Sequence, residues 1–166
     1  MKIGIITIFP EMFFSFMDYG ITNRALKKNL LTLKFLNPRN FSSDKRKKID
    51  SKIYGGGSGM LMTIQPIKDA IHQAKIYIGN FSKVIYLSPQ GDKLCQSKVM
   101  KFLDYSNIII VCGRYKGIDE RLIISEIDEE VSIGDYVISG GELGAMILID
   151  SISRVIPGVI KKKIHI

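Results

Sequence analysis

The chain has 166 residues, the size of one domain, and its 46% hydrophobic and 24% charged residues are typical of a folded globular protein and argue against extended disorder. No apolar run approaches the ~20 residues that span a bilayer, and no secretory signal is visible. Cys95 and Cys112 are too few for a disulfide framework or a zinc site. We therefore expect a cytoplasmic protein without a membrane partner.

The net charge of +8 is concentrated in one segment. Between Arg24 and Lys52 there are ten basic residues and two acids, so this segment alone carries +8 and the remainder is neutral. Such a stretch is typical of a surface that faces a polyanion, although a solvated loop is the alternative. Between Lys116 and Glu142 eight acids stand against two bases, which would suit a cationic ligand or a solvated acidic face.

The first half of the chain predicts one buried strand followed by helices. The Ile-rich run from Lys2 to Phe9 predicts a parallel strand. A helix should begin at Pro10 and Glu11, because Pro fits the first helical turn and an acid favours the positive end of the helix dipole. The later elements are a short helix, a strand, a long basic and Gly-rich loop, and an amphipathic helix, at 23–30, 31–36, 37–62 and 65–78.

The second half repeats a unit in which a strand leads through a Gly-containing loop into a helix. The expected strands are 84–87, 107–112 and 131–139, and the expected helices are 92–103, 119–125 and 142–155. Because strands alternate with helices, we predict an α/β fold with a mostly parallel sheet and helices on both faces. Ligands of such sheets bind outside the carboxyl ends of the strands, where these loops lie.

The three Gly-containing loops predict a pocket for a flat heterocycle. Their glycines let main-chain N–H and C=O groups approach a ligand closely. The Gly-rich stretch 55–59 lacks the residues of a phosphate loop or a dinucleotide fingerprint. His72 has no second His nearby, so no metal site is predicted. The apolar walls of the pocket would come from Leu87, Tyr115, Ile133, Tyr136 and Ile138.

Six separated motifs resemble the bacterial tRNA (guanine-N1)-methyltransferases. They run in register from residue 1 to about residue 160, and that combination is highly specific. The motifs are IGIITIFPEMF (3–13), YGGGSGM (54–60), YLSPQG (86–91), CGRYKGIDER (112–121), IGDYVISGGEL (133–143) and DSISRVIPG (150–158).

The resemblance implies a fold, an activity and partners. The fold would be an α/β domain over residues 1–160 with a trefoil knot in its C-terminal half (SPOUT-like), followed by a disordered tail at 161–166. The activity would be transfer of a methyl group from S-adenosyl-L-methionine to N1 of guanosine 37 in tRNA. The family works as a homodimer whose pockets lie at the subunit interface, so tRNA and a second copy are the expected partners.

The resemblance also implies the roles of individual residues. Arg154 matches an arginine that assists at the guanine. Asp50, Tyr54, Gly57 and Gly59 would lie on the substrate side. The residues that would hold the cofactor are Tyr86, Leu87, Ser88, Pro89, Gly91, Gly113, Lys116, Gly117, Ile133, Gly134, Asp135, Tyr136, Val137, Ile138, Gly140 and Gly141.

Two departures from the family pattern leave alternatives open. Family members continue through a linker with a catalytic aspartate and a small helical domain that grips tRNA, and this chain ends at Ile166, so we expect a truncated chain or a gene fragment. Lys116 stands where the family usually has Glu. The alternatives are a knotted dimer that binds cofactor or RNA without turnover, and a basic RNA-binding accessory protein.

Overall fold

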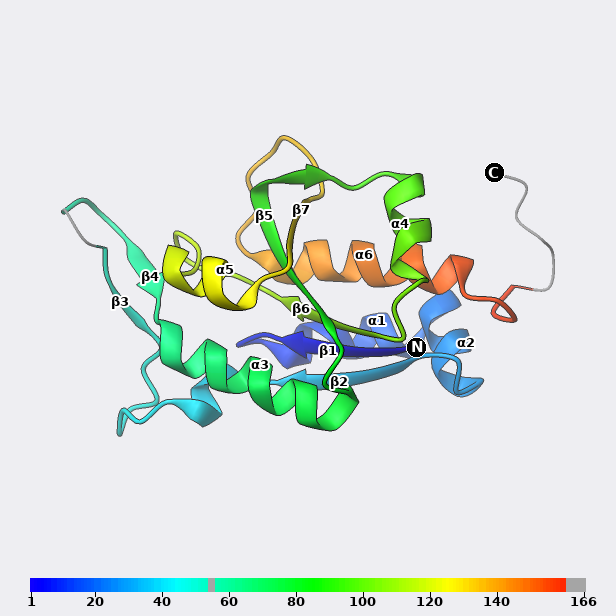
Figure 1. Cartoon of the computed structure of the whole chain (residues 1–166), viewed down its shortest axis with the longest axis horizontal. Helices are drawn as coiled ribbons and strands as arrows, with labels where there is room; N and C mark the ends of the chain where they lie inside the picture. Colours follow the sequence, from blue (N-terminus) through cyan, green and yellow to red (C-terminus); the bar gives the residue numbers. More distant parts are fainter. Residues whose placement is uncertain (54–55, 161–166) are drawn as a thin grey trace.

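A five-stranded parallel sheet forms the centre of the protein (Figure 1), in a computed structural model that describes residues 1–53 and 56–160. The strand order is β2-β1-β6-β5-β7, and each neighbouring pair is parallel. The α/β class and the mostly parallel sheet predicted from the sequence are confirmed. The strands are β1 (Lys2–Ile6), β2 (Thr32–Leu36), β5 (Lys83–Lys93), β6 (Asn107–Val111) and β7 (Glu129–Ser132).

Helices cover both faces of this sheet, as the alternating pattern predicts. Successive residues of a strand point to opposite faces, so Ile108 and Ile110 of β6 join one buried apolar cluster while Ile109 and Val111 join the other. The second cluster is closed by α3 (Ile64–Ile78) and α5 (Glu120–Glu126). The first is closed by η1 (Pro10–Phe13), α1 (Phe14–Asp18), α2 (Gly20–Lys27), α4 (Gln96–Phe102) and α6 (Gly141–Val155).

Helix α3 follows its sequence pattern closely. The five apolar residues predicted on one face are all buried: Ile67, Ala70, Ile71, Ala74 and Ile78. On the outer face His72 lies 3.2 Å from Glu126 of α5, which agrees with a surface role for this histidine. The apolar face fixes α3 against β1, β2 and β6, since each fully buried Ile contributes roughly 1.5–3 kcal/mol.

Strand β5 departs most clearly from the prediction. A helix was expected from residue 92, but the strand continues to Lys93 and α4 begins only at Gln96. The register with β7 shifts between Leu87 and Asp92, so β5 pairs with β7 a second time after a bend. Gly91 permits this bend, because a Cβ there would lie 2.4 Å from the carbonyl carbon of Glu130. Main-chain pairing with a distant strand therefore overrides the local pattern.

Three other boundaries differ from the prediction. The helix expected at 23–30 occupies Gly20–Lys27, and the extended stretch expected at 131–139 ends as a strand at Ser132. The loop expected at 37–62 contains η2 (Pro38–Phe41) and an antiparallel hairpin of β3 (Asp50–Lys52) and β4 (Met60–Met62). Tertiary contacts hold these short elements in place, so the sequence contains no periodic pattern that would have predicted them. The tail at 161–166, expected to be disordered, lies outside the described residues.

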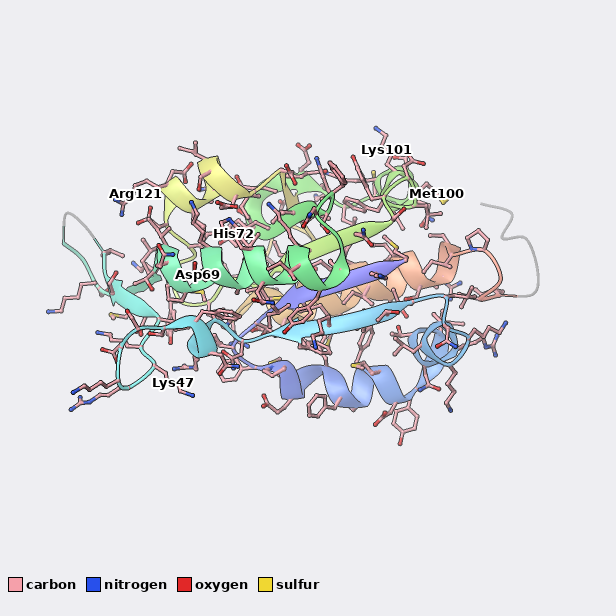
Figure 2. The ribbon with its side chains drawn as sticks, turned by 60° about the horizontal axis from the view of Figure 1, so that its bottom comes forward. Lys47, Asp69, His72, Met100, Lys101 and Arg121 are labelled. Atoms are coloured by element: carbon pink, nitrogen blue, oxygen red, sulfur yellow. The ribbon has the colours of Figure 1, made fainter. Side chains whose placement is uncertain are left out.

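The hairpin and the basic loop before it project from one end of the molecule (Figure 1). Figure 2 shows Lys47 in that loop, with its side chain pointing into solvent. The hairpin is fixed by two main-chain hydrogen bonds, from Lys116 N to Met60 O and from Met62 N to Gly117 O, each 3.0 Å long. In the described part of the chain, no helix is both long enough and apolar enough to cross a membrane.

Candidate functional site

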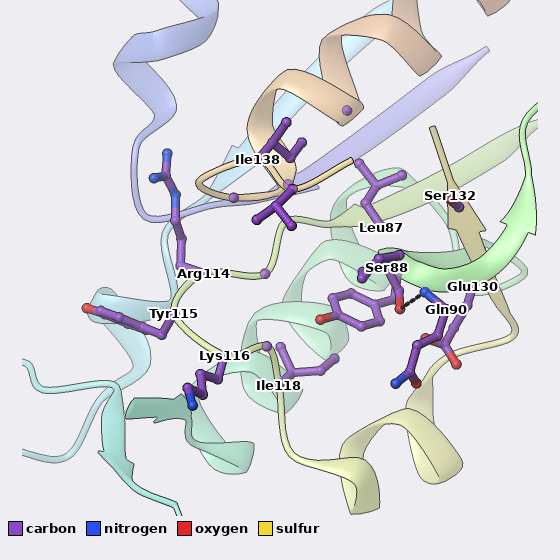
Figure 3. Close-up of a pocket in the computed structure, with 18 of the residues that line it drawn as sticks. Leu87, Ser88, Gln90, Arg114, Tyr115, Lys116, Ile118, Glu130, Ser132 and Ile138 are labelled. Carbon is purple, nitrogen blue, oxygen red and sulfur yellow. Dashed lines mark hydrogen bonds between the residues drawn. The ribbon is translucent and has the colours of Figure 1, made fainter. Parts of the chain in front are cut away.

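A cavity of about 410 Å³ lies beside the bend in β5 and the carboxyl ends of β6 and β7. Its walls are the three segments singled out in the sequence, of which 88–90 is the bend within β5 and 113–117 and 132–141 follow β6 and β7 (Figure 3). This is where ligands bind in open parallel sheets, and the volume lies in the range of small-molecule sites. A cavity thus lies where the sequence predicted a pocket, and its use as a cofactor site stays a prediction.

Most residues predicted to hold a cofactor line this cavity. Three of them do not: Gly91 packs against the backbone of β7, Ile133 approaches Gly144 of α6, and Asp135 is exposed and paired with Lys93 at 3.2 Å. The residues that line it are Tyr86, Leu87, Ser88, Pro89, Gly113, Lys116, Gly117, Gly134, Tyr136, Val137, Ile138, Gly140 and Gly141.

Two glycines are required by close approaches around the cavity. A Cβ on Gly113 would come within 2.9 Å of the Tyr86 hydroxyl. A Cβ on Gly141 would come within 2.7 Å of the Cys112 Cα, and the Gly141 N–H donates to Gly113 O at 2.9 Å. Helix α6 can therefore begin directly against the end of β6 because Gly141 lacks a side chain, and the Tyr86 ring can lie against position 113 because Gly113 lacks one.

A buried ion pair joins the walls of the cavity. Glu142, which is fully buried at the start of α6, accepts hydrogen bonds from Thr7 Oγ1 and Arg114 Nε, both at 2.8 Å. Arg114 also donates from Nη1 to the carbonyl oxygen of Ser139 at 3.3 Å. Because one guanidinium bonds both α6 and the loop 132–141, it fixes the relative positions of the loops.

Burial dominates the titration behaviour of the groups around the cavity. Burial raises the pKa of the Tyr86 hydroxyl, and the carboxylates of Glu130 and Glu120 raise it further, against a hydrogen bond with the backbone of Ile118 that lowers it. Burial also raises the pKa of Cys112 well above its usual range, so this thiol is protonated at neutral pH. The Tyr86 hydroxyl in the cavity wall is thus neutral, and the two acids that influence it also line the cavity.

Of the predicted substrate residues that the structure describes, Asp50, Gly57 and Gly59 do not line the cavity. Asp50 is half-buried on β3, and Gly57 and Gly59 adopt φ of 109° and 114°, which favours glycine. A Cβ on Gly59 would lie 2.8 Å from Lys116 Cε, so Gly59 adjoins the rim of the cavity. Tyr54 lies outside the described residues.

Arg154 is separated from the cavity within one chain. It is exposed in the last turn of α6, thirteen residues after Gly141, which corresponds to roughly 20 Å along a helix. The resemblance implies that Arg154 assists at the guanine, and this residue does not line the cavity of its own chain.

Sequence reasoning missed several residues that line the cavity. Gln90 and Arg114 lie inside motifs that were recognised, so their place in those motifs was the available signal, whereas Tyr115 had been predicted as an apolar wall and does line the cavity. Glu120 and Glu130 had no local signal, because their positions depend on how α5 and β7 pack beside β5. Among the described residues there is no cluster of His, Cys, Asp and Glu that could hold a metal ion.

Comparisons with known proteins point to one family. The family model described as "tRNA (Guanine-1)-methyltransferase TrmD" matches residues 1–166. Curated tRNA (guanine-N(1)-)-methyltransferases of Shewanella sediminis and Haemophilus influenzae are each 58% identical over 163 residues, which is 98% of this chain and 67% and 66% of theirs. This chain thus spans about two thirds of the length of these relatives.

A solved structure gives the same result. The crystal structure of tRNA (m1G37) methyltransferase from Aquifex aeolicus is 35% identical, with a TM-score of 0.90 over 98% of this chain and 73% of that one. With the sequence match along the whole chain, the shared parallel sheet and the cavity at its carboxyl edge, these findings show that the chain belongs to the tRNA (guanine-1)-methyltransferase family.

Proposed function

We propose that this chain forms the cofactor-binding domain of a methyltransferase that acts on N1 of guanosine 37 in tRNA, with S-adenosyl-L-methionine as the methyl donor. The observation that carries the proposal is the cavity between the three glycine-containing loops, in a chain of this family. A flat base held by main-chain groups suits these loops, and two carboxylates suit a cationic cofactor.

The residues present fit S-adenosyl-L-methionine on three counts. Gly113 and Gly141 line the cavity and let Tyr86 and the start of α6 pack closely around it, because neither position carries a side chain. Leu87 and Ile138 offer apolar walls for a purine, and Glu120 and Glu130 supply negative charge for a sulfonium and an ammonium group. The cofactor, when bound, supplies a methyl group already activated by positive sulfur.

The work of the protein is mainly positioning. Arg114 and Glu142 hold the loops in a fixed arrangement, and transfer between two held groups gains most from orientation. Guanine N1 carries a proton, so its reaction also needs a base and a cation near O6 to stabilise developing charge. We infer that Arg154 of a second copy supplies this cation, since Arg154 lies far from the cavity in its own chain. A homodimer with composite sites follows.

We further propose that the C-terminal half is knotted. The contacts that support it are those between the loops: Gly91 against the backbone of Glu130, and Gly141 against Cys112 and Gly113. A chain that threads its last helix past the loops before it would make contacts of this kind.

Two measurements test the proposed function. Titration calorimetry with S-adenosyl-L-methionine should give saturable binding. A methyl-transfer assay should label a tRNA transcript with guanosine at position 37 and leave a matched transcript with adenosine at that position unlabelled. Absence of cofactor binding would refute the proposal.

The position of Arg154 favours a second candidate, a module that binds cofactor or RNA without turnover. It predicts saturable cofactor binding with no labelling of either transcript. Binding of RNA with no binding of the cofactor would instead indicate an RNA-binding accessory protein.

A further inference from the structure

The cavity has two chemically different ends. At one end α6 meets β5, and a Cβ on Gly144 would lie 3.2 Å from Leu87 Cδ1, so the surface there is apolar and tight. At the other end Glu120 and Glu130 line the wall. Figure 3 shows Ile138 and Glu130 on opposite sides of the cavity, with Gln90 next to Glu130.

The carboxylate of Glu130 is incompletely bonded. Its Oε2 is buried, and within the described part of the chain no group donates a hydrogen bond to it. Glu130 pairs in register with Tyr86, which also lines the cavity. A buried carboxylate oxygen without a donor is costly, and such groups in native proteins usually await a partner that completes them.

The neighbouring acid behaves differently. Glu129 is bonded to Lys98 at 2.8 Å and lies 3.9 Å from Lys83, and it does not line the cavity. Successive residues of a strand point to opposite faces, so β7 directs Glu129 to cationic partners of the protein and Glu130 to the cavity. The two acids are neighbours on one strand and differ in two respects: Glu129 has lysine partners within the protein, and Glu130 faces the cavity.

We propose that Glu130 accepts a hydrogen bond from the α-ammonium group of S-adenosyl-L-methionine and so selects the amino-acid part of the cofactor. The inference rests on the proposed function. With the purine at the apolar end, the amino-acid part extends toward the acidic end. The ammonium is the cofactor's charged hydrogen-bond donor, and a charge-assisted bond in a desolvated site is the strongest that Glu130 can make. Glu120, which is exposed, adds attraction over a longer range.

The test compares three ligands by titration calorimetry: S-adenosyl-L-methionine, S-adenosylhomocysteine and 5′-methylthioadenosine, which lacks the amino-acid part. Glu130→Gln should weaken the binding of S-adenosyl-L-methionine and of S-adenosylhomocysteine roughly 10- to 100-fold, as expected for the loss of a hydrogen bond to a charged group. The dissociation constant of methylthioadenosine should change by no more than about 2-fold. The control Glu129→Gln should leave all three affinities unchanged.

The outcomes separate this inference from the proposed function. If Glu130→Gln weakens methylthioadenosine as much as the other ligands, Glu130 acts on the nucleoside or on the shape of the cavity, and the inference is wrong while the proposed function stands. If the unmodified chain binds none of the three, the proposed function fails, and the inference fails with it. If thermal unfolding shows that Glu130→Gln does not fold, Glu130→Asp replaces it, because this change keeps the charge and shortens the side chain. The inference then requires Glu130→Asp to weaken the two ligands that carry the amino-acid part and to leave the binding of methylthioadenosine unchanged.

Discussion

The side chain of Lys116 stands at the rim of the cavity, exposed and in contact range of Gly59. A cation here repels a cofactor that carries a sulfonium and an ammonium group. Because water screens an exposed charge, the effect is smaller than that of a buried one. The acids at the other end of the cavity offset it further.

Replacing this cation should therefore tighten cofactor binding. Lys116→Glu is expected to lower the dissociation constant of S-adenosyl-L-methionine by roughly 2- to 5-fold at low salt, and by less at high salt. Calorimetry at two salt concentrations measures this, and Lys101→Glu on α4, an exposed reversal that does not line the cavity, is the control. Unchanged or weaker binding would mean that residue 116 points away from the cofactor.

Helix α5 depends on one side chain at its start. Asp119 is the N-cap, and its Oδ1 accepts a hydrogen bond from Arg121 N at 3.0 Å. The hydrogen bond from the Arg121 side chain, together with this backbone bond and the Arg121 charge, holds the pKa of Asp119 below its usual value. The helix carries Leu122, which is fully buried, and Glu120, which lines the cavity, so the cap affects both stability and the site.

Removing the cap should destabilise the protein in a pH-dependent way. Asp119→Ala is expected to lower the free energy of unfolding by about 1 kcal/mol at neutral pH. The pKa is depressed in the folded state, so the stabilisation is complete above the unfolded value of about 3.9 and is lost as pH falls through the lower folded value. Denaturant unfolding at pH 7 and at about pH 3 measures this, and Asp119→Asn, which keeps an acceptor, should lose less. An equal loss at both pH values would contradict an electrostatic contribution from the cap.

Strand β5 shows how one element positions two parts of the site. Its first part carries Tyr86 and Leu87 to the cavity, and its second part returns to β7 beside Gly91. The double pairing holds β7 in the register that places Glu130 opposite Tyr86. The acidic end of the cavity is therefore a consequence of strand pairing.

At the scale of the molecule, the basic charge lies on a structured loop. Asp44 Oδ1 accepts hydrogen bonds from the backbone N–H groups of Arg46 at 2.7 Å and Lys48 at 3.3 Å, which shapes the turn, and Lys47 adopts φ of 54°. The exposed cations follow on this turn, at the end of the molecule that carries the β3–β4 hairpin (Figure 1). A preformed basic turn suits a phosphate backbone.

Neutralising this turn should weaken RNA binding and its salt dependence together. Changing Lys45, Lys47 and Lys48 to Gln is expected to reduce the slope of log affinity against log salt by up to about 2 to 3, since each phosphate contact contributes ~0.7 to 0.9. Filter binding of a tRNA transcript over a salt series measures the slope. The triple change Lys2, Lys93 and Lys101 to Gln, at exposed positions outside the basic turn, should change it little. Equal effects of both sets would mean that RNA binds without using the basic turn.

The outer face of α6 bears on the oligomeric state. Ala145, Leu148 and Ile149 are fully buried in their own chain, so these three residues of the apolar run 145–149 need no second copy to cover them. Leu143 and Ile147, one turn apart, are 50% and 45% exposed, and Arg154 lies exposed at the end of the same helix. A second copy that covers this face would bring Arg154 into a shared site.

We accordingly expect a dimer, and we expect that one charged substitution on the exposed face of α6 will dissociate it. Light scattering at micromolar concentration should give twice the mass of the chain, and Ile147→Asp should give the monomer mass with unchanged circular dichroism. Ile124→Asp, on the exposed side of α5, should remain a dimer. A monomer in the unmodified chain would refute the composite site.

The amino-acid sequence by itself determined the α/β class, the long helices and the three loops that form the cavity. These features are encoded locally, in the apolar periodicity of α3 and in glycines that follow apolar strands. The tertiary structure alone decided the second pairing of β5, the Glu130 Oε2 atom without a donor at the cavity wall and the distance of Arg154 from the cavity. Each of these depends on which distant segments pack side by side, and local sequence patterns do not specify such contacts.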